Sequence, residues 1–131
     1  MYFGLIAPEM PTGAPRLDFY PSTTPSLESM QKMVGGLIEP IFTVQRPGAE
    51  PDKMITGYVN EEFLFIFGED APDTGTVNFP DYFQPWKGNM VIVGLDYATG
   101  DSVALTEEDK LFLQSIWSAK DKTLNLNWGI Q

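Results

Sequence analysis

The sequence contains no cysteine and no histidine. Without cysteine the chain has no disulfide bonds and no thiolate nucleophile, and nothing in it indicates secretion. Without histidine it lacks imidazole metal ligands and the usual general base at neutral pH. A hydroxyl nucleophile such as Ser102 or Thr106 would have no such base to activate it. We therefore expect a protein that is not an enzyme, with no catalytic residue, no metal site and no cofactor.

Long apolar runs are missing as well. Residues 1–7 are apolar, but they carry no basic residue and are followed by Pro8, Glu9 and Pro11. This is not the pattern of a signal peptide, and no stretch is long enough to cross a bilayer as a helix. We therefore expect a cytoplasmic protein that does not bind a membrane.

Basic residues are scarce, with 8 Lys and Arg against 18 Asp and Glu, which gives a net charge of −10. From Met54 to Asp109 the only basic residue is Lys87, against eleven acidic residues, so this segment alone carries −10. The eleven are Glu61, Glu62, Glu69, Asp70, Asp73, Asp81, Asp96, Asp101, Glu107, Glu108 and Asp109. Such a surface repels nucleic-acid phosphates and attracts a basic protein surface. An acidic surface that only keeps the protein soluble is the alternative.

The length of 131 residues and a hydrophobic content of 43% suit one domain, 1–131, with a packed core. A first helix is expected at about residues 25–34, with Thr24 as N-cap and Gly35-Gly36 as its end. A second helix is expected to begin after Thr106, because three carboxylates follow it and the helix dipole favours them there.

Most of the remaining chain has the pattern of β-strands, at residues 1–7, 17–20, 37–44, 55–59, 63–67, 90–95, 102–105 and 124–130. Pro40 predicts an edge strand or a bulge within 37–44. Apolar residues on both faces of 63–67 predict a central strand, paired with 55–59 through a hairpin. Residues 8–15 and 68–76 are expected to be loops, and 77–86 irregular. The sequence thus predicts an α+β fold, mostly antiparallel sheet, with one short helix near the N-terminal third and one near the C-terminus.

Four segments carry a family resemblance. They are 26–39 (SLESMQKMVGGLIE), 60–62 (NEE), 88–94 (GNMVIVG) and 105–108 (LTEE). In this order they resemble the domain-of-unknown-function family 3846, small proteins of phages, plasmids and their bacterial hosts. The resemblance covers about residues 26–113; Phe63 stands where the family has glycine, and 68–86 departs from its pattern. It implies no catalytic residues, and it implies an accessory protein of a phage or mobile element.

The carboxylates match no known site pattern. Glu69, Asp70 and Asp73 lack the spacing of a calcium-binding loop. Glu61 and Glu62 are adjacent in a predicted turn, where carboxylates point apart and are solvated, so an acid–base pair is not expected.

The leading hypothesis is a non-enzymatic acidic protein that binds and inhibits a host protein with a basic surface, such as a defence or nucleic-acid-handling factor. The candidate partner-binding residues are Glu61, Glu62, Glu69, Asp70, Asp73, Asp81, Tyr82, Phe83 and Trp86. The three aromatic residues could instead be core side chains under a loop. A sharper form of the hypothesis is DNA mimicry, which requires the carboxylates to form a spaced row on one surface.

The alternative hypothesis is a small-molecule binding protein that sequesters a nucleotide signal. The acidic composition opposes an anionic ligand unless Arg16, Lys32, Arg46 or Lys53 converge on one pocket. All four lie in the first half of the chain, so the fold decides whether they meet.

Overall fold

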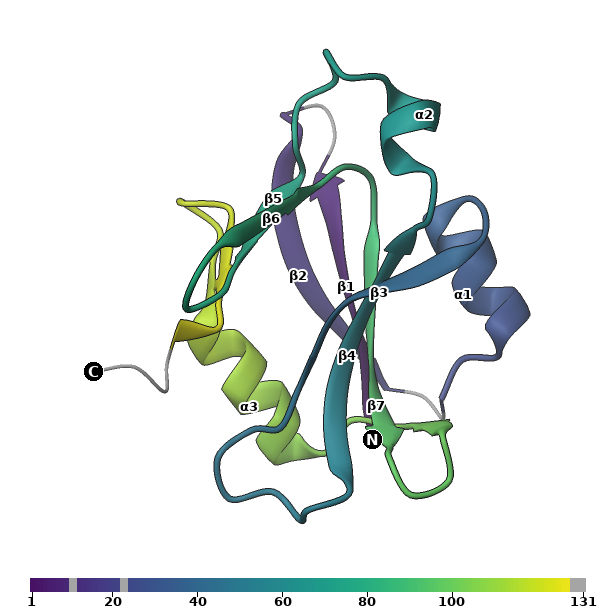
Figure 1. The fold of residues 1–131 in the computed structure, drawn as a ribbon, viewed down its shortest axis with the longest axis vertical. Helices are drawn as coiled ribbons and strands as arrows, with labels where there is room; N and C mark the ends of the chain where they lie inside the picture. Colours follow the sequence, from purple (N-terminus) through teal and green to yellow (C-terminus); the bar gives the residue numbers. More distant parts are fainter. Residues whose placement is uncertain (10–11, 22–23, 128–131) are drawn as a thin grey trace.

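The computed structural model describes residues 1–9, 12–21 and 24–127. They form two sheets and three helices (Figure 1). In chain order the elements are β1 (Tyr2–Glu9), β2 (Ala14–Pro21), α1 (Leu27–Val34), β3 (Ile38–Val44), β4 (Lys53–Asn60), α2 (Phe63–Phe67), β5 (Gly75–Asn78), β6 (Phe83–Trp86), β7 (Met90–Asp96), β8 (Asp101–Val103), α3 (Glu107–Ile116), β9 (Trp117–Ser118) and β10 (Thr123–Asn125). The α+β class and the helices near both predicted places are confirmed.

The larger sheet has the order β2-β1-β7-β4-β3, with β8 beside β7, and all its pairs are antiparallel. Strand β7 is central because it is the most apolar stretch, and residues Met90 to Val93 are fully buried in it. Strand β3 forms one edge, and its register with β4 shifts between Pro40 and Phe42. Both features that Pro40 predicted are therefore present.

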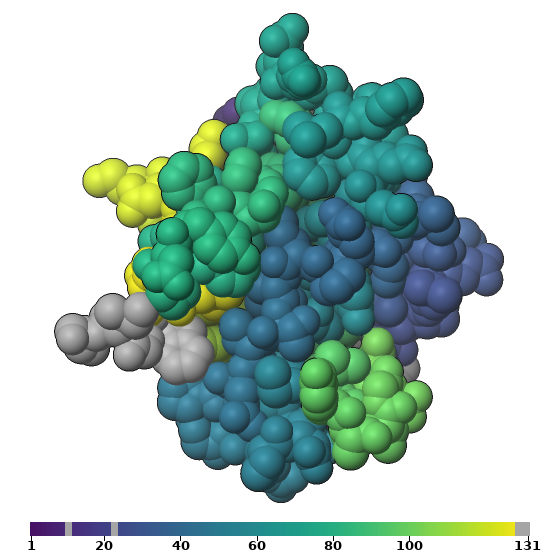
Figure 2. Space-filling model, in the orientation of Figure 1, coloured from purple at the N-terminus to yellow at the C-terminus, as the bar shows by residue number. Residues whose placement is uncertain are grey.

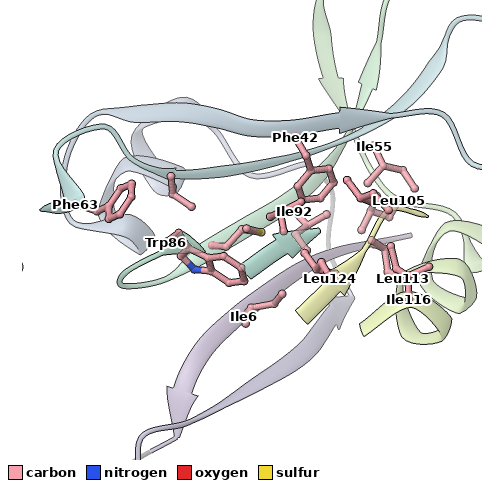
Figure 3. Close-up of a cluster of buried hydrophobic side chains, with 14 residues drawn as sticks. Ile6, Phe42, Ile55, Phe63, Trp86, Ile92, Leu105, Leu113, Ile116 and Leu124 are labelled. Carbon is pink, nitrogen blue, oxygen red and sulfur yellow. The ribbon is translucent and has the colours of Figure 1, made fainter. Parts of the chain in front are cut away.

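The smaller sheet has the order β6-β5-β10-β9 and contains the parallel pair β5–β10. The main core lies between this sheet, helix α3 and one face of the larger sheet (Figure 3). Its centre includes Trp86, Ile92 and Leu124, all fully buried. Helix α3 contributes Leu113 and Ile116 to the same core.

Helix α1 covers the opposite face of the larger sheet. Met30 and Val34 pack against Val91 and Val93 of β7. The predicted start of this helix was two residues early, because Ser26 is the N-cap and its hydroxyl accepts a hydrogen bond from Ser29 N at 3.1 Å. The predicted start of α3 is confirmed.

The predicted central strand at 63–67 is wrong, because this segment is helix α2. The Asn60 side chain accepts a hydrogen bond from Glu62 N at 2.7 Å and turns the chain out of β4. Helical bonds then run from Ile66 N to Glu62 O and from Gly68 N to Leu64 O, both 2.9 Å. Five consecutive apolar residues show neither the period of a strand nor that of a helix. Here the change of chain direction at Asn60 makes the segment helical.

Three further segments differ from expectation. Residues 77–86, expected to be irregular, contribute to the hairpin β5–β6, where Pro80 lies in the turn and Pro85 in an edge strand. The predicted loop 8–15 is shorter, because β1 and β2 pair out to Glu9 and Ala14. The predicted C-terminal strand is present as β10, while Trp128 and Ile130 lie outside the described residues. Within the described residues, no helix has the length and apolar character needed to cross a membrane.

Candidate functional site

Helix α2 presents most of its apolar side chains to solvent. Phe65 is 88% exposed, and Leu64, Ile66 and Phe67 are between 44% and 56% exposed. Exposed carboxylates flank the helix on both sides, Glu61 and Glu62 before it and Glu69 and Asp70 after it. We call these eight residues the α2 surface; it lies at the top of the molecule in Figure 2. An apolar centre with a charged rim is the usual anatomy of a protein-binding surface.

Two aromatic side chains of α2 attach the helix to the rest of the molecule. Phe63 is buried and points into the main core (Figure 3). The ring of Phe67 covers Gly88, where a Cβ would lie only 2.7 Å from Phe67 Cε2. These two rings hold α2 on the molecule while its outward face stays uncovered.

The entry to α2 is held by the buried side chain of Asn60. Its Nδ2 donates to the carbonyl of Val34 at 3.2 Å, and its Oδ1 accepts from Glu62 N at 2.7 Å. The neighbouring Glu61 N donates to Leu37 O at 2.8 Å. Asn60 therefore joins the end of α1 to the beginning of α2.

The end of α1 is shaped to receive this side chain. Gly35 has a φ of +83°, the left-handed conformation that ends many helices. A Cβ on Gly36 would lie 2.8 Å from Asn60 Nδ2, so only glycine leaves room there. Asn89 Nδ2 donates to Met33 O at 2.9 Å, so side-chain amides from β4 and from the residue before β7 bind the last carbonyls of α1.

The exit from α2 is held by Lys87, which is almost fully buried. Its ammonium group donates to the carbonyl of Ala71 and, at 2.8 Å, to Asp73 Oδ1. The loop that follows α2 is thus tied to the residue after β6.

A family model described as Domain of unknown function (DUF3846) matches residues 6–117. This chain belongs to the DUF3846 family. No curated protein and no solved structure matches it. The resemblance carried by the segments 26–39, 60–62, 88–94 and 105–108 is therefore confirmed. In this DUF3846 chain the first three of those segments meet at the end of α1, through Asn60, Asn89 and Gly36.

The predicted partner-binding residues of the DUF3846 chain lie in four places. Glu61, Glu62, Glu69 and Asp70 belong to the α2 surface, and Asp81, Tyr82 and Phe83 are exposed at the turn of the β5–β6 hairpin. Asp73 is engaged by Lys87. Trp86 is completely buried, so its ring is part of the core and does not reach the surface.

The remaining carboxylates lie elsewhere. Asp96 pairs with Lys53, at the opposite end of β4 from Asn60, and Asp109 pairs with Arg46 at 2.7 Å. The hydrogen bond from Lys53 also holds the pKa of Asp96 below its usual range. The two ends of β4 are more than about 20 Å apart at the usual rise of a strand. The Asp96 and Asp109 pairs therefore lie far from the carboxylates of the α2 surface.

Two of the four candidate basic residues, Arg46 and Lys53, meet at one cavity, and Arg16 and Lys32 are not part of it. Arg46 and Lys53 line a cavity of about 280 Å³ beside Met54 and Val103, but each is paired with a carboxylate. Arg16 is paired with Glu9 and Asp18 on the β1–β2 hairpin, and Lys32 with Glu28 on α1. No group of three potential metal ligands occurs in the part of the chain that the structure describes.

The apolar residues of the α2 surface were missed by sequence reasoning, since Leu64 to Phe67 were assigned to a buried strand. The sequence does contain one indication that this run is not a buried strand. The run is bounded by two acidic residues on each side and by Gly68, and such flanks are unusual for a strand buried on both faces.

Proposed function

We propose that this DUF3846 chain is a non-enzymatic accessory protein of a phage or mobile element that docks on a host protein and inhibits it. Docking occurs through the α2 surface, and the partner presents an apolar groove edged by lysine or arginine. The observation that carries this proposal is the combination of four exposed apolar side chains on one short helix with four carboxylates around them.

The exposed rings and aliphatic chains suit protein binding. Apolar side chains gathered on the surface of a soluble protein mark interaction sites, and large aromatic residues supply much of the binding energy at interfaces. Phe65 is the most exposed of the large hydrophobic residues described. A short helix that inserts such side chains into a groove is a recurrent mode of recognition.

The charge of the rim selects the partner. The net charge of −10 opposes docking of a second copy, because the acidic rims of two α2 surfaces would meet. A partner with basic residues around the groove gains attraction instead. Clusters of basic residues commonly bind nucleic-acid phosphates, so a chain docked on such a basic edge would cover it and inhibit the partner.

The proposal is tested by capture from a bacterial lysate with two charge-matched variants. One variant carries Glu61→Gln, Glu62→Gln, Glu69→Gln and Asp70→Asn on the α2 surface. The control carries Glu50→Gln, Asp52→Asn, Asp101→Asn and Glu108→Gln, four exposed carboxylates away from α2.

We expect the wild type and the control to retain one host protein at about 50 mM salt and to lose most of it at about 300 mM, because salt screens exposed charges. The α2-surface variant is expected to retain little at either concentration. Equal retention by both variants, or no retained protein at either salt concentration, would contradict the proposal.

A further inference from the structure

We propose that a cavity beside α2 receives an arginine side chain of the docked partner; this inference rests on the proposed function and specifies the partner's chemistry. The cavity measures about 200 Å³ and is lined by residues 39–41 of β3, Phe63, Phe79, Tyr82 and Gln84. These segments meet on the face shown in Figure 2, with β3 in blue, α2 in teal and the β5–β6 hairpin in green. Because Phe63 is the first residue of α2, the cavity adjoins the α2 surface.

One wall of the cavity is aromatic. The rings of Phe79 and Tyr82 are stacked, with their centroids 4.7 Å apart and their planes inclined by 19°. The turn that carries them is closed by a hydrogen bond from Phe79 N to Tyr82 O at 2.7 Å. Tyr82 is 59% exposed, so one aromatic side chain of the stack is open to a ligand. Such a ring attracts cations.

The cavity also has polar and acidic lining groups. Glu39 is exposed on β3, and it takes part in none of the ion pairs of the described residues. Gln84 Nε2 donates to Pro85 O at 3.0 Å, which leaves Gln84 Oε1 as an acceptor. Asp81 lies in the same turn as Tyr82 and adds negative charge near the opening. An anionic ligand is therefore disfavoured here.

An arginine side chain matches this set of groups. Its guanidinium is planar, stacks on an aromatic face, and donates paired hydrogen bonds to a carboxylate. A guanidinium stacked on Tyr82 would have Glu39 and Gln84 as acceptors in the same cavity. Lysine offers a point charge and neither the planar face nor the fork, so the cavity favours arginine over lysine.

The structure therefore assigns two neighbouring contacts to the partner. An apolar groove takes the side chains of α2, and an arginine at the edge of that groove enters the cavity. This pairing would fix the orientation of the docked helix, because a bidentate contact is directional whereas apolar contacts are not.

The cavity can be tested without the partner. Uniformly ¹⁵N-labelled protein is titrated with N-acetyl-arginine-N-methylamide, and with the citrulline analogue, which is of similar shape and uncharged. We expect saturable shifts of the amides of Glu39, Ile41, Tyr82 and Gln84 with the arginine compound, and a Kd of about a few millimolar, as suits one side chain. The citrulline compound is expected to bind at least about fivefold more weakly, because it has lost the charge.

Two variants complete the test. Glu39→Gln is expected to weaken binding of the arginine compound at least about fivefold, and Glu50→Gln, an exposed carboxylate elsewhere, to leave it unchanged. The inference is overturned if the arginine compound gives no saturable shift, if citrulline binds equally well, or if Glu39→Gln has no effect. These outcomes leave the capture experiment untouched, so failure of the cavity and failure of the docking proposal are distinguishable.

Discussion

Replacing Phe65 by alanine is expected to abolish capture of the host protein while the fold stays intact. The ring is 88% exposed, so its loss removes almost no buried contact from the free protein. In the proposed complex the same ring is the central apolar anchor. Truncation of such an anchor costs about 2–4 kcal/mol, or roughly 30- to 1,000-fold in affinity.

The matched control is Tyr97→Ala. Tyr97 is 70% exposed and belongs to the turn between β7 and β8. That turn lies at the other end of the molecule from α2 (Figure 1). Binding of the captured protein is measured by titration calorimetry, and stability by urea unfolding. We expect Phe65→Ala to unfold like the wild type and bind far more weakly, and Tyr97→Ala to match the wild type in both. Binding that survives Phe65→Ala would rule out the anchor role.

Replacing Asn60 by alanine is expected to lower the free energy of unfolding by about 2–4 kcal/mol. The side chain is 3% exposed and makes two hydrogen bonds, one to Val34 O and one from Glu62 N. Its removal leaves the buried carbonyl of Val34 and the partly buried amide of Glu62 without their partner, and each such loss costs about 1–3 kcal/mol. The same change frees the entry to α2, so capture is expected to weaken as well.

Asn125→Ala is the control for this variant. Asn125 is exposed and accepts one local hydrogen bond, from Asn127 N at 3.0 Å. Its loss is expected to cost less than about 1 kcal/mol in urea unfolding, because water replaces an exposed hydrogen bond. A free-energy change below about 0.5 kcal/mol for Asn60→Ala would show that the contact with α1 does not hold the fold together.

Local signals predicted much of the fold. The cap at Thr106, the glycine pair after Val34 and the apolar run of β7 each carry a strong chemical preference, and the structure follows them. Pro40 also predicted the edge and the shift in register, because proline cannot donate to a ladder. In these places the local preference and the tertiary contacts agree.

The predictions of local structure were wrong where a contact with a distant part of the chain determines that structure. The segment at α2 is helical because Asn60 turns the chain, and Asn60 is held by a carbonyl 26 residues away in sequence. The hairpin β5–β6 forms around a buried Trp86 despite two prolines, because those prolines lie in the turn and at the sheet edge. Neither contact can be read from the segment itself.

The charge pattern of the sequence predicted the acidic residues of the candidate site, but the exposure of its apolar residues was not predicted. Four of the predicted carboxylates form the rim of the α2 surface, whereas Asp73 is paired with Lys87 and Trp86 is buried. The apolar centre was assigned to the core, because composition indicates that a side chain is apolar but not which way it points. The cavity at Glu39 joins residues from three separate segments, and their meeting is a property of the fold.

Site-specific photo-crosslinking tests the central claim most directly. A benzoylphenylalanine is placed at position 65 of α2 or, as control, at position 97, and each protein is irradiated in a bacterial lysate. We expect one discrete product from position 65 that excess unlabelled wild type removes and that Phe65→Ala does not, and no such product from position 97. Mass spectrometry is expected to place the crosslink in an apolar groove edged by arginine. No product from position 65, or the same product from both positions, would contradict docking through the α2 surface.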